Sequence, residues 1–235
     1  MTPRILALET STHGRVLVED AADGAAPAGL IVAFHGYGHN AQIMLDAVRQ
    51  IPGASRWRIA SVQALHRFYA RDSQTVIASW MTREDRELAI ADNVAYVDRA
   101  IEMSQAGPTE DRSASRVQGP PVVLVGFSQG TSMAYRAALL GRHGVSGVIA
   151  LGGDIPPELK TNEPRDRPHA SARAWPAVLI GAGATDPYYT ATKLDSDLAF
   201  LSSRGVPHDV VRYAGGHEWT EAFRRAAGDW LATRA

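Results

Sequence analysis

A short apolar segment that runs directly into a glycine-flanked serine constrains the fold of this chain most strongly. Residues 122–125 are all apolar, without polar alternation, which is typical of a strand buried on both faces of a parallel sheet. The motif Gly-Phe-Ser-Gln-Gly follows at 126–130, and the small and apolar residues at 132–140 then predict a buried helix. A strand that turns at once into a helix indicates an α/β fold.

Signals for strands and helices alternate along the rest of the chain. Further strands are predicted at 15–19, 30–34, 58–62, 145–151, 177–180 and 209–213, and helices after Asn40 and at about 83–103, 192–204 and 220–232. Residues 5–8 and 15–19 are predicted to pair as a hairpin. The alternation predicts a mostly parallel central sheet with helices on both faces. No shift in composition marks a boundary, so a single domain over 1–235 is expected.

The composition excludes several classes of function. The 235 residues carry 24 Lys and Arg against 25 Asp and Glu, so no global positive field is available to hold nucleic acid or an anionic membrane. The chain has no cysteine, which excludes disulfides, thiolate metal sites and a cysteine nucleophile. No stretch approaches the ~20 apolar residues of a membrane-spanning helix, and the run at 5–8 is too short for a signal peptide. These observations predict a cytoplasmic protein.

The motif at 126–130 is G-x-S-x-G in the strand–turn–helix context that a nucleophile elbow requires. Glycines on both sides let neighbouring backbone pass close to the turn, and the serine hydroxyl is exposed near the positive end of a helix. We therefore predict that Ser128 is a nucleophile. The alternative is a glycine-flanked turn that only packs the helix onto the sheet.

A serine nucleophile needs a base, and the chain supplies an acid and a histidine in the order that this fold uses. Asp186 lies in Gly-Ala-Thr-Asp-Pro, and His217 lies in Gly-Gly-His-Glu-Trp, each after one of the last two predicted strands. We predict that Asp186 and His217 complete a triad with Ser128. Asp154 follows an earlier strand and is the alternative acid.

Other polar residues are weaker candidates. His208 directly precedes its strand and is expected at the surface, and Asp195 and Asp197 are expected to face solvent from a helix. His35 and His39 are spaced like a metal-binding pair on a helix, but the glycines between them disfavour a helix there. No metal site is predicted.

An oxyanion hole needs two backbone N–H groups aimed at the developing charge. One is expected from Gln129, which follows the serine. The other is expected from the His-Gly-Tyr-Gly loop at 35–38, whose glycines let the loop bend towards the serine, and we assign it to Tyr37.

Together, these four motifs resemble those of the phospholipase/carboxylesterase family of α/β-hydrolases, which includes small bacterial carboxylesterases and acyl-protein thioesterases. The resemblance implies an α/β-hydrolase fold without a large lid domain, and hydrolysis of carboxylic esters or thioesters through an acyl-enzyme with no cofactor. It also implies Ser128 as nucleophile, Asp186 as orienting acid and His217 as base, with Tyr37 and Gln129 as oxyanion donors.

The resemblance extends over about residues 30–232, with two departures. The family commonly has Asp soon after the His-Gly-x-Gly loop, whereas His39 and Asn40 follow it here. The polar segment 156–173 is long for a connection between core strands, and it could shield the site.

Three aromatic residues are candidates for substrate binding. Trp80 resembles a tryptophan near the acyl pocket of the family. Phe68 and Tyr69, on an expected loop beyond a strand end, could line the same pocket. The alternative for each is a partly buried aromatic residue without contact to substrate.

These observations predict a serine carboxylesterase that acts on a small-molecule ester or thioester. Acyl-protein thioesterase or lysophospholipase-type activity is the nearest alternative, since one site can cleave either kind of bond. A non-catalytic binding protein of the same fold is disfavoured because all three triad positions are present. A peptidase is disfavoured because such enzymes usually carry a larger gating domain. Acyl-chain length, leaving group and oligomeric state are left open.

Overall fold

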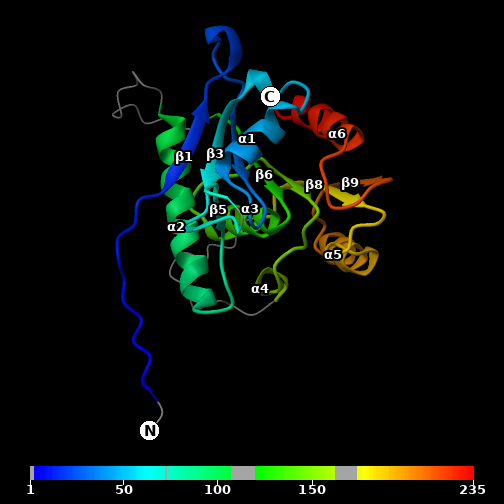
Figure 1. The fold of residues 1–235 in the computed structure, drawn as a ribbon. Coiled ribbons are helices and arrows are strands. Elements are labelled where there is room, and N and C mark those ends of the chain that lie inside the picture. Colours follow the sequence, from blue (N-terminus) through cyan, green and yellow to red (C-terminus); the bar gives the residue numbers. More distant parts are fainter. Residues whose placement is uncertain (1–2, 72, 107–119, 162–173) are drawn as a thin grey trace.

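The structure is a computed structural model that describes residues 3–71, 73–106, 120–161 and 174–235. A seven-stranded sheet in the order β1-β3-β2-β6-β7-β8-β9 forms its centre (Figure 1). The strands are β1 (Arg15–Glu19), β2 (Leu30–Phe34), β3 (Arg58–Gln63), β6 (Val122–Phe127), β7 (Gly147–Leu151), β8 (Ala177–Gly183) and β9 (His208–Tyr213). β1 pairs with β3 in antiparallel fashion, and the other neighbours are parallel. The predicted α/β class with a mostly parallel sheet is confirmed.

Helices cover both faces of this sheet. The helices are α1 (Ala41–Arg49), α2 (Arg86–Gln105), α3 (Gln129–Leu140), α4 (Pro157–Lys160), α5 (Ala191–Ser203) and α6 (Glu221–Ala232), with short 3-10 turns at Ala22–Gly24 and Ala54–Arg56. Alternate residues of β2 enter two separate hydrophobic clusters, one with α2, α3 and α5 and the other with α1 and α6. The strands are therefore buried on both sides, which explains their continuous apolar sequences.

Side-chain caps hold the starts of two helices. The Asn40 side chain accepts a hydrogen bond from the N–H of Ile43 at the start of α1. Thr220 does the same for Phe223 at the start of α6. These oxygens satisfy N–H groups that have no partner within the helix.

The expected N-terminal hairpin is absent from the structure. Residues 5–8 form no strand, with Ile5 86% and Leu8 83% exposed, and the blue N-terminal segment in Figure 1 extends away from the sheet. β1 pairs with β3 instead. A strand gains more from the edge of a large sheet than from an isolated two-stranded hairpin, which is marginally stable in water.

A separate two-stranded hairpin replaces the loop that was expected around Phe68. It consists of β4 (His66–Tyr69) and β5 (Val76–Ser79), with Phe68 opposite Ile77. All of β4 is exposed, so no buried face imposes an apolar pattern that the sequence could reveal. A bridge between His39 and Ala78 connects this hairpin to the loop after β2.

The expectation that Asp197 faces solvent is wrong. Its carboxylate is buried, forms an ion pair of 2.6 Å with Lys160, and accepts hydrogen bonds from the Tyr189 hydroxyl at 2.9 Å and the Ile155 N–H at 3.1 Å. These partners compensate for the loss of water, which a helical pattern alone cannot predict. Asp195, by contrast, is exposed as expected.

Most of the polar segment 156–173 lies outside the described residues, because the structure describes it only as far as 161. Its first part forms the short helix α4. In the described part of the chain, no helix is both long enough and apolar enough to cross a membrane.

Candidate active site

Ser128 lies at the turn between β6 and α3 in a strained backbone conformation. Its φ of 55° and ψ of −121° are unfavourable for a residue with a side chain. The flanking glycines are required by close contacts: a Cβ on Gly126 would lie 2.5 Å from the Thr131 Cα, and one on Gly130 would lie 2.0 Å from the Phe34 carbonyl oxygen. This is the geometry that the motif predicts for a nucleophile elbow.

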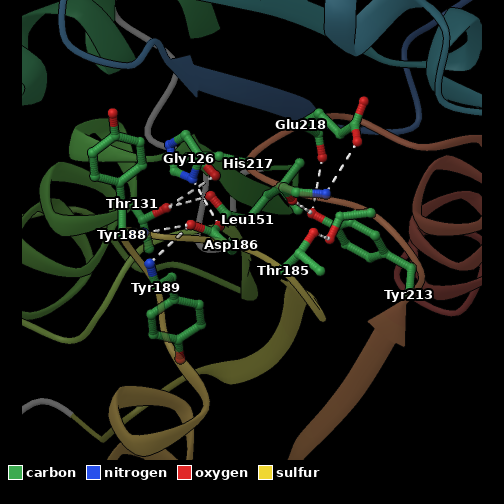
Figure 2. Close-up of polar contacts among 12 residues, drawn as sticks. Gly126, Thr131, Leu151, Thr185, Asp186, Tyr188, Tyr189, Tyr213, His217 and Glu218 are labelled. Carbon is green, nitrogen blue, oxygen red and sulfur yellow. Dashed lines mark hydrogen bonds and ion pairs between the residues drawn. The ribbon is translucent and has the colours of Figure 1, made fainter.

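Hydrogen bonds hold this turn against the neighbouring strand. The Ser128 N–H donates to the Leu151 carbonyl at 2.8 Å. The Thr131 hydroxyl lies 3.2 Å from the carbonyl oxygens of both Gly126 and Leu151. Figure 2 draws these contacts as dashed lines. The sequence patterns did not single out Thr131, because a threonine in the first turn of a helix has no distinctive spacing. Its bonds tie the strained turn to β7.

His217 and Asp186 meet at the end of the sheet. The His217 Nδ1 lies 2.7 Å from the Asp186 Oδ2. The loops after β8 and β9, which are neighbouring parallel strands, carry Asp186 and His217 respectively (Figure 2). The Asp186 carboxylate is fully buried, while 17% of the His217 side chain is exposed. The pair has the contact that an orienting acid makes with a catalytic histidine.

The surroundings of Asp186 favour its ionised form. Burial by itself would raise the pKa of Asp186, but hydrogen bonds from the N–H groups of Tyr189 and Tyr188 and from His217 outweigh it, so the pKa lies below the ordinary value. The Tyr188 and Tyr189 N–H groups both reach the Oδ1, at 2.8 and 3.0 Å. The Oδ2 therefore remains for the imidazole.

The loop that carries His217 is fixed on both sides. The Tyr213 hydroxyl donates to the Glu218 carbonyl at 2.9 Å, and the Thr185 hydroxyl donates to the Gly215 carbonyl at 2.9 Å (Figure 2). The sequence did not indicate either contact, since both join residues through main-chain oxygens that any sequence provides. They restrict where the imidazole can lie.

Aromatic contacts place the imidazole beside the elbow. The His217 ring packs against Phe127, which precedes Ser128, and against Tyr188, with both ring centroids 4.9 Å away. Among the residues that the structure describes, the Ser128 hydroxyl makes no hydrogen bond. Catalytic hydrogen bonds are often long without substrate and tighten in the complex.

The segment after β7 separates the two candidate acids. Gly152, with φ +65°, leaves room for the pair, because a Cβ there would lie 3.1 Å from the His217 ring and 3.3 Å from Asp186. Asp154 points elsewhere: its half-exposed carboxylate lies 3.6 Å from Lys193. The structure therefore brings Asp186 to His217 and leaves Asp154 apart.

His35 braces the loop after β2. Its Nε2 accepts the Ala64 N–H at 3.1 Å, so its Nδ1 carries the proton and donates to the Gly36 carbonyl at 2.8 Å. Burial lowers the pKa of His35 to about 4, against the raising effect of the bond to Gly36. The imidazole is thus neutral at pH 7 and has both nitrogens engaged, which leaves none for a metal.

The two residues that follow Tyr37 in this loop both have hydrogen-bonded N–H groups. The Gly38 N–H donates to Ala78 at 3.0 Å, and the His39 N–H donates to Gly36 at 3.1 Å. Within the described residues, neither the Tyr37 N–H nor the Gln129 N–H has a hydrogen-bond acceptor. The Gln129 N–H begins α3, where helical N–H groups lack partners.

The loop also lies against the serine. A Cβ on Gly36 would lie 3.2 Å from the Cβ of Ser128. Two N–H groups without acceptors, those of Tyr37 and Gln129, therefore belong to segments that meet at Ser128. This is the arrangement that an oxyanion hole needs.

The three aromatic candidates occupy different environments. Trp80 is fully buried against Phe34, and its indole N–H donates to the His35 carbonyl at 2.8 Å, so it supports the core rather than an accessible surface. Phe68 and Tyr69 are exposed on β4, and the Phe68 ring lies 5.9 Å from the ring of Tyr37.

No cluster of three or more possible metal ligands occurs in the ranges 3–71, 73–106, 120–161 and 174–235. His39, the other member of the spaced pair, stacks on Phe127.

A family model described as Phospholipase/Carboxylesterase matches residues 17–192. No curated protein sequence matches the chain.

Several solved structures share its fold. An esterase named PE8 is 22% identical with a TM-score of 0.68, covering 95% of this chain and 100% of that one. The Bacillus cereus carboxylesterase is 17% identical with a TM-score of 0.64, covering 94% and 95%. The Zea mays acyl-protein thioesterase 2 is 17% identical with a TM-score of 0.69, covering 94% and 99%.

Proposed function

This chain belongs to the phospholipase/carboxylesterase family of α/β-hydrolases, and we propose that it is a serine carboxylesterase that works through an acyl-enzyme on Ser128. One observation carries the proposal: the 2.7 Å contact between His217 and Asp186, packed against the residue that precedes a strained serine. Asp186 and His217 complete the triad, and Tyr37 and Gln129 provide the oxyanion donors.

The mechanism follows from the hydrogen bonds of the imidazole. The His217 Nδ1–H donates to the ionised Asp186, so the Nε2 holds the lone pair that accepts the proton of Ser128. The serine oxygen then attacks the acyl carbonyl, and the two N–H groups stabilise the oxyanion. His217 gives the proton to the leaving alcohol. Water repeats the sequence on the acyl-enzyme and releases the acid.

The substrate is a small-molecule ester in this proposal, with Phe68 and Tyr69 as candidate contacts for the acyl chain. Their exposure and the proximity of the Phe68 ring to the Tyr37 ring support this role. Thioester cleavage is the second candidate, because the structure named as an acyl-protein thioesterase has the same fold with a TM-score of 0.69. Rates on esters and thioesters with the same acyl chain distinguish the two.

The experiment is an assay on p-nitrophenyl esters from acetyl to palmitoyl with the variant Ser128→Ala. We expect the variant to lose at least about 10³-fold in kcat, because removal of a nucleophile abolishes the covalent route. The matched control is Ser132→Ala, which removes a hydroxyl from the first turns of α3, next to the elbow, and should keep kcat within twofold. Turnover retained in folded Ser128→Ala would contradict the assignment.

A further inference from the structure

The side chain of Gln129 is bound entirely to the residues at the end of β5. Its Oε1 accepts the Trp80 N–H at 2.9 Å, and its Nε2 donates to the Ser79 hydroxyl at 3.1 Å and the Met81 carbonyl at 3.3 Å. The Ser79 hydroxyl donates in turn to the Met81 carbonyl at 2.8 Å. The residue that provides one proposed oxyanion donor is therefore attached to β5 by its side chain.

The same part of β5 holds the loop that contains the other donor. The Ala78 carbonyl accepts the Gly38 N–H at 3.0 Å, and the Ala78 N–H donates to the His39 carbonyl at 2.8 Å. On the other side of Tyr37, the Trp80 indole donates to the His35 carbonyl at 2.8 Å. The loop is thus bound both before and after Tyr37, to Trp80 just beyond the end of β5 and to Ala78 within it.

Trp80, which follows β5 directly, is itself fixed. Trp80 has no exposed surface, and its ring packs against Phe34 and His35, with centroids 5.5 and 5.4 Å away. The Asn93 side chain, buried on α2, donates to the Trp80 carbonyl at 2.7 Å. A rigid support of this kind holds the groups that bind to it in fixed positions, instead of moving with them.

We propose that residues 78–81, here named the β5 clamp, set the distance between the two oxyanion N–H groups, with the Gln129 side chain and the Trp80 indole as positioning residues. This inference rests on the proposed function. An oxyanion hole acts only if both donors lie at hydrogen-bond distance from the charge in the transition state. Loss of the clamp therefore lowers kcat and leaves ground-state binding of the ester unchanged.

Two variants test the clamp without removing either backbone N–H. Gln129→Met keeps the length of the side chain and removes its hydrogen bonds, and Trp80→Phe keeps an aromatic ring and removes the indole N–H. The readouts are kcat and KM on the best p-nitrophenyl ester, and the Ki of an alkyl trifluoromethyl ketone of matched chain length. The ketone adduct carries an oxyanion, so its Ki reports on both donors.

We expect each variant to lower kcat by about 10- to 100-fold, less than the loss of a whole donor, with KM changed less than twofold. The Ki of the ketone should rise by the same factor as kcat falls. The matched control is Trp57→Phe, a core tryptophan in the other hydrophobic cluster, which should keep both kcat and Ki.

Wild-type kcat and Ki in folded Gln129→Met would overturn the inference, as would a rise in KM with kcat unchanged. Gln129 is half-buried, so this variant remains informative even if Trp80→Phe fails to fold. Failure of the proposed function gives a different result, because Ser128→Ala would then retain activity whatever the clamp variants do.

Discussion

His35 and His217 carry the same imidazole, but their surroundings give them different chemistry. His35 is buried and uses both nitrogens to hold main-chain groups. His217 is partly exposed and is bonded to a buried carboxylate, so one nitrogen remains for a substrate or a serine. The environment, rather than the residue type, separates a structural histidine from a candidate base.

The first prediction concerns the pH dependence of stability through His35. Its pKa is about 4 in the folded protein and 6.5 ordinarily, so the unfolded chain binds a proton more readily between these values. Stability from this group is complete above pH 6.5 and is lost as pH falls towards 4. Wild type should therefore lose about 2 to 3 kcal/mol more unfolding free energy than His35→Gln between pH 7 and 4.5, measured by urea denaturation. Equal losses in the two proteins would contradict this reading.

The second prediction concerns Asp186. Asp186→Asn should lower kcat by about 10³- to 10⁴-fold with little change in KM, because an amide can hold the wrong tautomer of His217. Steady-state kinetics on the best ester measure this. Asp154→Asn is the control, since Asp154 pairs with Lys193 instead. A larger loss in Asp154→Asn than in Asp186→Asn would reverse the assignment of the acid.

Secondary-structure elements differ in how far their sequences specify them. The core strands and helices carry their signal in continuous apolar runs or helical spacing, and caps such as Asn40 mark helix starts. The hairpin β4–β5 was not predicted because all of β4 is exposed, and the contacts of the β5 clamp join residues that lie far apart in the sequence. Residues 5–8 were wrongly predicted as a strand because a short apolar run has the composition of one. In the structure they pair with no strand, and β1 pairs with β3 instead.

The third prediction belongs to α1. Asn40→Ala should lower the free energy of unfolding by about 1 kcal/mol, because the Ile43 N–H loses its acceptor. Asn40→Asp retains that acceptor and should recover most of the loss in urea denaturation. If both variants are as stable as wild type, the cap contributes nothing measurable.

For the whole molecule, topology explains why distant residues meet. β6, β7, β8 and β9 are parallel neighbours, so the loops that follow them emerge at one edge of the sheet. The order of strands and motifs therefore predicts that Ser128, Asp186 and His217 converge, and the structure shows His217 in contact with Asp186 and with Phe127, the residue before Ser128. The supports of the site, such as Thr131, Thr185 and the buried Trp80, could not be predicted, since they bind main-chain atoms. One sheet links the described ranges, and we infer a single domain.

The most direct test of the account is covalent labelling of the wild-type protein with a fluorophosphonate, followed by peptide mapping with mass spectrometry. The reagent reacts with a serine only where a base and an oxyanion hole activate it. We predict one adduct, on Ser128, which is lost in Ser128→Ala and greatly slowed in His217→Ala. An adduct on another serine, or unlabelled Ser128 in a protein that turns over esters, would contradict the central claim.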